Sequence, residues 1–197
     1  MANPQSPMNY AFKIVIVGAK GVGKTCLFNR YCFNSFNINS AETIGLNFHS
    51  THLTLQSCDE NGLEKENLIT ISIFDLAGHE RFKPLIPKFI EGANGALLVF
   101  DCVDRTSINH LDYWFNEIIK HAGDPTIPKI LVGSKSDLLN NSNLECVSEE
   151  TIEKIVHEKN LNDFYKTSAL ANNNVLNVFK RLSELMFKHH EKNIAYV

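Results

Sequence analysis

The chain has 197 residues, of which 44% are hydrophobic and 21% are charged, and its formal net charge is −3. This length and apolar content suit one globular domain with its own core and exclude an intrinsically disordered chain. The small acidic excess excludes a broad basic surface, so we expect no nucleic-acid partner and expect any polyphosphate ligand to bind in a local pocket.

The first ten residues are polar and lack the basic-then-apolar order of a signal peptide, so we predict a flexible N-terminus over residues 1–10. The five cysteines are scattered without a zinc-binding spacing, which indicates reduced thiols in a cytoplasmic protein. Ala2 excludes an N-myristoylation signal, and no cysteine follows Cys146 for prenylation. We therefore expect no encoded lipid anchor, and peripheral recruitment to endomembranes would depend on a partner protein.

The first half of the chain begins with a strand and a helix. Residues 12–17 form a β-branched run that ends at Gly18, and residues 24–31 are expected to be helical. Residues 51–55 and 68–74 then predict an antiparallel pair of strands.

The connection between these two strands, residues 56–67, is long and polar. A solvated loop is the simpler interpretation, and a contact with a specific partner is the alternative.

The second half alternates strands with helices. Continuous apolar runs at 96–100 and 127–132 are typical of strands whose two sheet faces are both covered. Residues 107–121 have helical apolar spacing, Ser148 is a candidate N-cap of another helix, and a long terminal helix begins near Val175.

This order of elements predicts a layered α/β domain with a mostly parallel sheet. Ligands in such folds bind beyond the carboxyl ends of the strands. The loops that begin at Gly18, Asp75, Ser134 and Thr167 each follow a predicted strand, so we expect them to meet at one edge of the sheet.

Residues 18–25 match the phosphate-binding pattern GxxxxGK[ST] between a strand and a helix. Its glycines let backbone N–H groups surround phosphates, Lys24 is expected to bridge the β and γ phosphates, and the Thr25 hydroxyl is expected to ligate Mg²⁺. The predicted nucleotide contacts of this segment are Gly18, Lys20, Gly21, Val22, Gly23, Lys24, Thr25 and the following Cys26.

Two later segments extend this site. Asp75 of Asp75-Leu76-Ala77-Gly78 suits the Mg²⁺ shell through water, and the Gly78 N–H suits the γ-phosphate. Asp137 of Ser134-Lys135-Ser136-Asp137 supplies a carboxylate that can accept both N–H groups of a guanine edge, a donor pair that adenine lacks. We therefore predict guanine rather than adenine nucleotides.

These motifs, in order with Thr43-Ile44-Gly45 and Thr167-Ser168-Ala169-Leu170, resemble the Ras-like small GTPases over nearly the whole chain. Segments 44–48, 75–82 and 89–95 are most similar to the Rab branch. The resemblance implies a three-layer P-loop NTPase fold with a mostly parallel six-stranded sheet, one antiparallel strand and helices on both faces. It also implies a GTPase domain over residues 11–190, a short tail at 191–197, and a monomer.

The resemblance assigns roles to individual residues. Thr43 ligates Mg²⁺ in the GTP state, Phe36 packs on the guanine, Lys135 lies along the base and ribose, and the Ala169 N–H meets the guanine O6. The remaining contacts expected at the base end are Ser134, Leu138, Ser168 and Leu170. Lys24, Gly78 and His79 would act in GTP hydrolysis, and the switch loops would bind an exchange factor, a GTPase activator and effector proteins, in vesicle trafficking.

Three residues depart from the family pattern. His79 stands where most relatives have the glutamine that orients the attacking water, so we expect slow hydrolysis. Lys20 lies near the path of an activator's arginine finger and would hinder it, unless it points into solvent. Ser134 replaces an asparagine that ties its loop to the P-loop, and we expect this tie to be lost and GDP release to be fast.

Our leading hypothesis is a Rab-like GTPase that cycles between GDP and GTP forms with Mg²⁺. The alternative is a GTP-binding interaction module with negligible hydrolysis, which the three departures favour. An ATP-using P-loop kinase ranks third because Asp137 and Ser168-Ala169 suit guanine.

Overall fold

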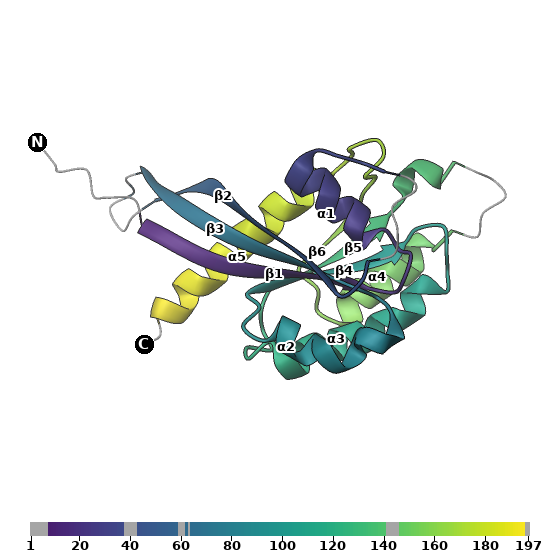
Figure 1. The fold of residues 1–197 in the computed structure, drawn as a ribbon. Coiled ribbons are helices and arrows are strands. Elements are labelled where there is room, and N and C mark those ends of the chain that lie inside the picture. Colours follow the sequence, from purple (N-terminus) through teal and green to yellow (C-terminus); the bar gives the residue numbers. More distant parts are fainter. Residues whose placement is uncertain (1–7, 38–42, 59–61, 63, 141–145, 196–197) are drawn as a thin grey trace, which may run out of the picture.

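The computed structural model describes residues 8–37, 43–58, 62, 64–140 and 146–195. Its centre is a six-stranded sheet in the order β2-β3-β1-β4-β5-β6 (Figure 1). β2 runs antiparallel to β3, and the other neighbouring strands are parallel. The strands are β1 (Met8–Gly18), β2 (Leu46–Cys58), β3 (Glu64–Leu76), β4 (Gly95–Asp101), β5 (Lys129–Ser134) and β6 (Asp163–Lys166).

Helices cover both faces of the sheet. The α-helices are α1 (Lys24–Phe33), α2 (Ile86–Ile90), α3 (Leu111–His121), α4 (Glu149–Glu158) and α5 (Val175–Ala195). Short 3₁₀ turns precede α2 and α3 at Glu80–Leu85 and Ser107–His110, and a third, Ser136–Leu138, follows β5. The predicted three-layer architecture is confirmed.

The two cores follow from the alternation of side chains along each strand. In β1, Ile14 and Ile16 pack with α1 and α5 on one face of the sheet. Val15 and Val17 pack with α2, α3 and α4 on the other face. Because both faces are covered, β4 and β5 are buried along their whole length, as their continuous apolar runs predicted.

The sheet is longer than the sequence indicated. β1 begins at Met8, inside the predicted flexible N-terminus, and pairs with β3 from that residue onward. Most of segment 56–67, expected to be a solvated loop, is strand: the pairing of β2 with β3 continues to Cys58 and Glu64. The buried Asn67 supports this extension, because its side-chain amide donates to the Leu55 carbonyl and to Ser57 Oγ.

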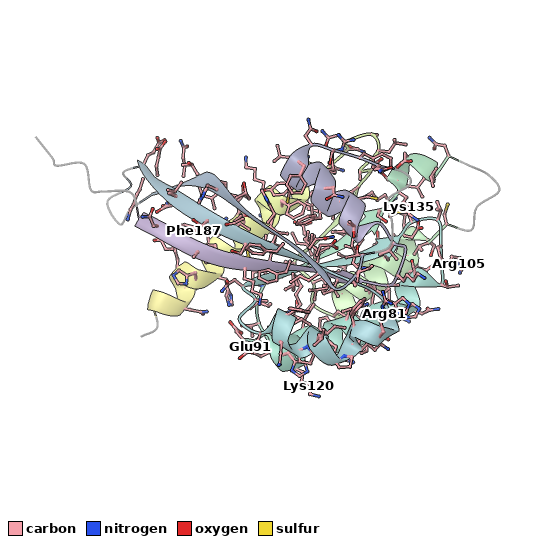
Figure 2. The ribbon with its side chains drawn as sticks, viewed as in Figure 1. Arg81, Glu91, Arg105, Lys120, Lys135 and Phe187 are labelled. Atoms are coloured by element: carbon pink, nitrogen blue, oxygen red, sulfur yellow. The ribbon has the colours of Figure 1, made fainter. Side chains whose placement is uncertain are left out.

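The last turns of α5 pack against the extended part of the sheet. The helix continues to Ala195, past the predicted end of the domain at residue 190. Its Phe187 meets the ring of Tyr10 edge-to-face at 5.1 Å and lies beside the far end of β1 (Figure 2). His190 contacts the Tyr10 ring at 5.6 Å.

Two further expectations concern the described residues. Ser148 is the N-cap of α4, and its hydroxyl accepts a hydrogen bond from the Thr151 N–H. Cys26, Cys32, Cys102 and Cys146 are free thiols. Within the described ranges, no helix combines the length and apolar character needed to cross a membrane.

Candidate nucleotide site

A cavity of about 490 Å³ lies at the carboxyl ends of the strands, where the loops were expected to meet. Most of the predicted site residues line it: Lys20, Gly21, Gly23, Lys24, Thr25, Cys26, Phe36, Thr43, Gly78, His79, Ser134, Lys135, Asp137, Leu138, Ala169 and Leu170. Leu27, Ala77 and Thr167 also line the cavity but were not among the predicted contacts. Figure 2 shows Lys135 at this end of the sheet, opposite the end that carries Phe187.

The predicted contacts Gly18, Val22 and Ser168 lie behind the cavity wall rather than on it. Gly18 packs so closely on β4 that a Cβ there would overlap the Val99 carbonyl oxygen. Val22 and Ser168 are buried, at 2% and 1% exposure. These three residues therefore shape the backbone that surrounds the cavity.

The P-loop turns into α1 at Gly23, which has a left-handed φ of 92° that a residue with a side chain rarely adopts. This places Lys24 in the first turn of α1, buried at 5% exposure. Its ammonium donates hydrogen bonds to the carbonyls of Gly18 (2.9 Å) and Ala19 (2.6 Å). Burial lowers the pKa of Lys24 to about 8, although the Asp75 carboxylate opposes this shift.

Three oxygen-bearing side chains from distant segments meet beside Lys24. Thr25 Oγ1 donates to Asp75 Oδ2 at 2.7 Å and lies 2.5 Å from Thr43 Oγ1. Asn47 Nδ2 donates to the same Asp75 oxygen at 2.9 Å. The other oxygen, Asp75 Oδ1, is buried and has no hydrogen-bond partner among the described residues. Burial raises the pKa of Asp75, while the bonds from Thr25 and Asn47 and the charge of Lys24 oppose that effect.

Gly78 packs directly against the P-loop. A Cβ at this position would lie 2.6 Å from the Ala19 carbonyl carbon and from the Lys20 nitrogen. The neighbouring Ala77 N–H donates to the Gly45 carbonyl at 3.1 Å, which joins the segment after β3 to the start of β2. Asp75 itself lies near the end of β3 rather than in the loop, as does Ser134 at the end of β5.

At the other end of the cavity, Asp137 and Ala169 come from adjacent loops. Ser168 Oγ donates to Asp137 Oδ1 at 2.5 Å and also accepts from the Ala171 N–H. Lys135 forms an ion pair of 2.6 Å with Asp101 at the end of β4. The arrangement places the Asp137 carboxylate, Ala169 and the Lys135 side chain around one space.

Ser134 ties its loop to the P-loop, so the expected loss of this tie is wrong. Its buried hydroxyl is within hydrogen-bond distance of the Val22 carbonyl and lies 2.9 Å from the Phe100 carbonyl. A hydroxyl has one proton, so it donates to one of these oxygens at a time. The shorter serine side chain reaches the P-loop because β5 ends directly beside it.

His79 and Lys20 share the rim between the first cavity and a second one of about 360 Å³. His79 caps the 3₁₀ turn that follows it, because its Nδ1 accepts from the Arg81 N–H at 3.3 Å. The Lys20 side chain is exposed.

Comparison with known protein families identifies the family. The sequence model that describes the Ras family matches residues 13–188 of this chain. The chain belongs to the Ras family. It is a small GTPase that binds GTP and GDP, as the motif order predicted.

Its relatives include the GTP-binding protein ypt3 of Schizosaccharomyces pombe, which is 36% identical over 91% of this chain and 78% of its own length. Ras-related protein RABA5e of Arabidopsis thaliana is 38% identical over 87% of this chain and 72% of its own length. Ras-related protein Rab-15 of Mus musculus is 32% identical over 93% of this chain and 80% of its own length. The resemblance to the Rab branch is thereby confirmed.

Besides the lining residues Leu27, Ala77 and Thr167, three residues that hold the site in place were not predicted from the sequence. Asn47 bonds to Asp75, Asp101 pairs with Lys135, and Arg30 bonds to the Ala169 carbonyl. Asp101 ends an apolar strand beside the ligand edge, so its position was a usable signal. Arg30 had none, because its partner is 139 residues away in the chain.

Proposed function

We propose that this Ras-family GTPase is an Mg²⁺-dependent switch of the Rab type that acts in vesicle trafficking and hydrolyses GTP slowly. The observation that carries this proposal is the convergence of Thr25, Thr43 and Asp75. These residues lie at the start of α1, in the segment before β2 and near the end of β3. A ligand that binds all three joins the segment before β2 and the end of β3 to the P-loop, and these two segments would be the switch loops.

The donor set fits Mg²⁺. This ion prefers oxygen ligands and is usually held by one or two carboxylates together with substrate phosphates. Thr25 and Thr43 would be direct ligands, and Asp75 would bind through water with the oxygen that has no partner among the described residues. When bound, Mg²⁺ would neutralise charge on the β and γ phosphates.

The remaining roles follow the two ends of the cavity. Lys24 would exchange its two carbonyl partners for phosphate oxygens, and the Gly78 N–H would face the γ-phosphate. Asp137 would accept the guanine N–H groups, while the Ala169 N–H would bond to O6 and Phe36 would cover the ring.

Replacing Thr43 tests the switch. Thr43→Ala should weaken binding of a non-hydrolysable GTP analogue about tenfold with Mg²⁺ present and leave GDP affinity nearly unchanged. Thr54→Ala, at an exposed position on β2, is the matched control. Equal effects of Thr43→Ala on both nucleotides would show that Thr43 does not sense the γ-phosphate.

Slow hydrolysis is supported by the hydrogen bond of His79. In the neutral ring, an Nδ1 that accepts from Arg81 leaves the proton on Nε2, which can then donate but not accept. A glutamine side chain offers both a donor and an acceptor to the attacking water. Single-turnover GTP cleavage should therefore be faster in His79→Gln than in the natural protein, and an equal or slower rate in the variant would contradict this role.

The same observation favours the second candidate, a GTP-binding module with negligible turnover. Lys20 adds to it, because an exposed cation at the rim would repel an arginine supplied by an activator. A single-turnover rate indistinguishable from that of GTP in buffer would select this alternative.

Exposed apolar side chains close to Thr43, in the segment before β2 and in β2 itself, support binding of effector proteins. Ile44 is 77% exposed and Phe48 is 56% exposed, and the Phe48 ring packs edge-to-face on Phe74 at 5.1 Å. Apolar side chains this exposed next to a nucleotide-controlled loop suit a partner that distinguishes the two states. Phe48→Ser should abolish capture of GTP-dependent partners, whereas Leu176→Ser, at the exposed start of α5, should not.

A further inference from the structure

Arg30 on α1 connects the base end of the cavity to the body of the domain. Its Nε donates to the Ala169 carbonyl at 2.7 Å, and its Nη2 lies 3.5 Å from the Leu170 carbonyl. Its Nη1 donates to the backbone oxygen and the side-chain oxygen of Asn34 at 3.0 and 3.1 Å. The guanidinium thus spans the end of α1 and the loop after β6.

The Asn34 bonds orient the guanidinium. Asn34 is the C-cap of α1 in a left-handed conformation, and its N–H bonds back to the Asn29 carbonyl. Its position is therefore set by the helix itself. Because the guanidinium is planar and its donors point in fixed directions, binding Nη1 to Asn34 aims Nε and Nη2 at the loop.

The loop needs such a support. Ala169 follows the buried Ser168, but Leu170 is 53% exposed and Asn172 has a φ of 54°. Ser168 is held by Asp137 and by the bridge to Asn173, so the loop is anchored behind Ala169. Arg30 supplies the anchor on the other side of Ala169, at the peptide group between Ala169 and Leu170.

We propose that Arg30 is a positioning residue for guanine: it holds the Ala169–Leu170 backbone so that the Ala169 N–H is aimed at O6 of the base. This inference rests on the proposed function, which assigns that N–H to O6. Lysine cannot replace Arg30, because a single ammonium cannot bond to Asn34 and to the loop carbonyls in this forked geometry.

The test compares ligands that differ at O6. Dissociation constants are measured with the full chain for GDP, for IDP, which keeps O6 and the N1 proton, and for the diphosphate of 2-aminopurine riboside, which lacks both. Each variant is compared with the natural protein for the same ligand, so that the missing contact between N1 and Asp137 cancels. Arg30→Met and Arg30→Lys should each weaken GDP and IDP about tenfold, the worth of one hydrogen bond, and change the third ligand less than about twofold. Arg181→Met, which removes an arginine paired with Asp163 away from the cavity, should change none of the three.

The possible outcomes separate the two proposals. Equal weakening of all three ligands, or no weakening of GDP in either variant, would overturn the role of Arg30. If the natural protein itself shows no preference for GDP and IDP over the 2-aminopurine ligand, the assignment of O6 to Ala169 fails, and the inference fails with it. If Arg30→Met does not fold, Arg30→Lys gives the same discrimination among the three ligands.

Discussion

The buried ammonium of Lys24 gives nucleotide binding a pH dependence. Its pKa is lowered to about 8 in the ligand-free protein, chiefly by burial and despite the Asp75 carboxylate. Phosphate anions beside it would raise that pKa, so the nucleotide binds best to the protonated form. The affinity for GDP should be constant at pH values well below the pKa of Lys24 in the ligand-free protein, and it should fall as the pH rises through that pKa. The linkage relation gives about a fourfold loss of GDP affinity between about pH 7 and about pH 8.5.

Competition against fluorescent GDP across this range measures the effect, and the guanine ring keeps its own N1 proton there. Lys24→Arg is the control, because arginine stays protonated throughout. It should bind GDP more weakly, owing to its different shape, but with a flat profile. A flat profile in the natural protein, or the same fall in Lys24→Arg, would refute the reasoning.

Three further predictions concern single side chains. Gly78→Ala places a Cβ 2.6 Å from P-loop backbone and should weaken GTP-analogue binding about tenfold, measured by titration; an unchanged constant would show that this loop yields freely. Ser134→Ala removes the hydroxyl that reaches Val22 and should speed release of fluorescent GDP about fivefold, whereas equal rates would deny the tie any role. Burial acts to raise the pKa of Asp124, but bonds from Thr126 and His189 lower it to about 2. The ionised Asp124 therefore stabilises the fold at pH values above the pKa of an aspartate in the unfolded chain, and this stabilisation is lost as the pH falls toward 2. The free energy of urea unfolding should vary less with pH in this window for Asp124→Asn than for the natural protein, and an identical pH dependence would contradict the prediction.

The phosphate end of the site could be predicted because the residues that form it are neighbours in the sequence. Gly23, Lys24 and Thr25 occupy a single turn between a strand and a helix, so the spacing alone specifies what their backbone does. The position of Asp75 in the oxygen cluster was also predictable, because Asp75 lies near the end of β3, at the same edge of the sheet as the P-loop.

The parts that could not be predicted depend on distances between segments. The tie made by Ser134 depends on how closely β5 ends beside Val22, which no spacing in the sequence reports. Arg30 donates to backbone carbonyl groups, and because every residue has such a carbonyl, the sequence does not show which residue accepts the bond. The long sheet was missed because its support, Phe187 on α5, is about 180 residues from Tyr10 in the chain.

The central claim is that this chain binds guanine nucleotides with Mg²⁺ and hydrolyses GTP slowly. Nucleotide content of the purified protein, followed by single-turnover hydrolysis of loaded GTP with Mg²⁺ or with EDTA, tests it most directly. We predict one guanine nucleotide per chain, slow conversion of GTP to GDP with Mg²⁺, and rapid nucleotide loss with EDTA. Bound adenine nucleotide, or guanine nucleotide held equally well without Mg²⁺, would contradict the account.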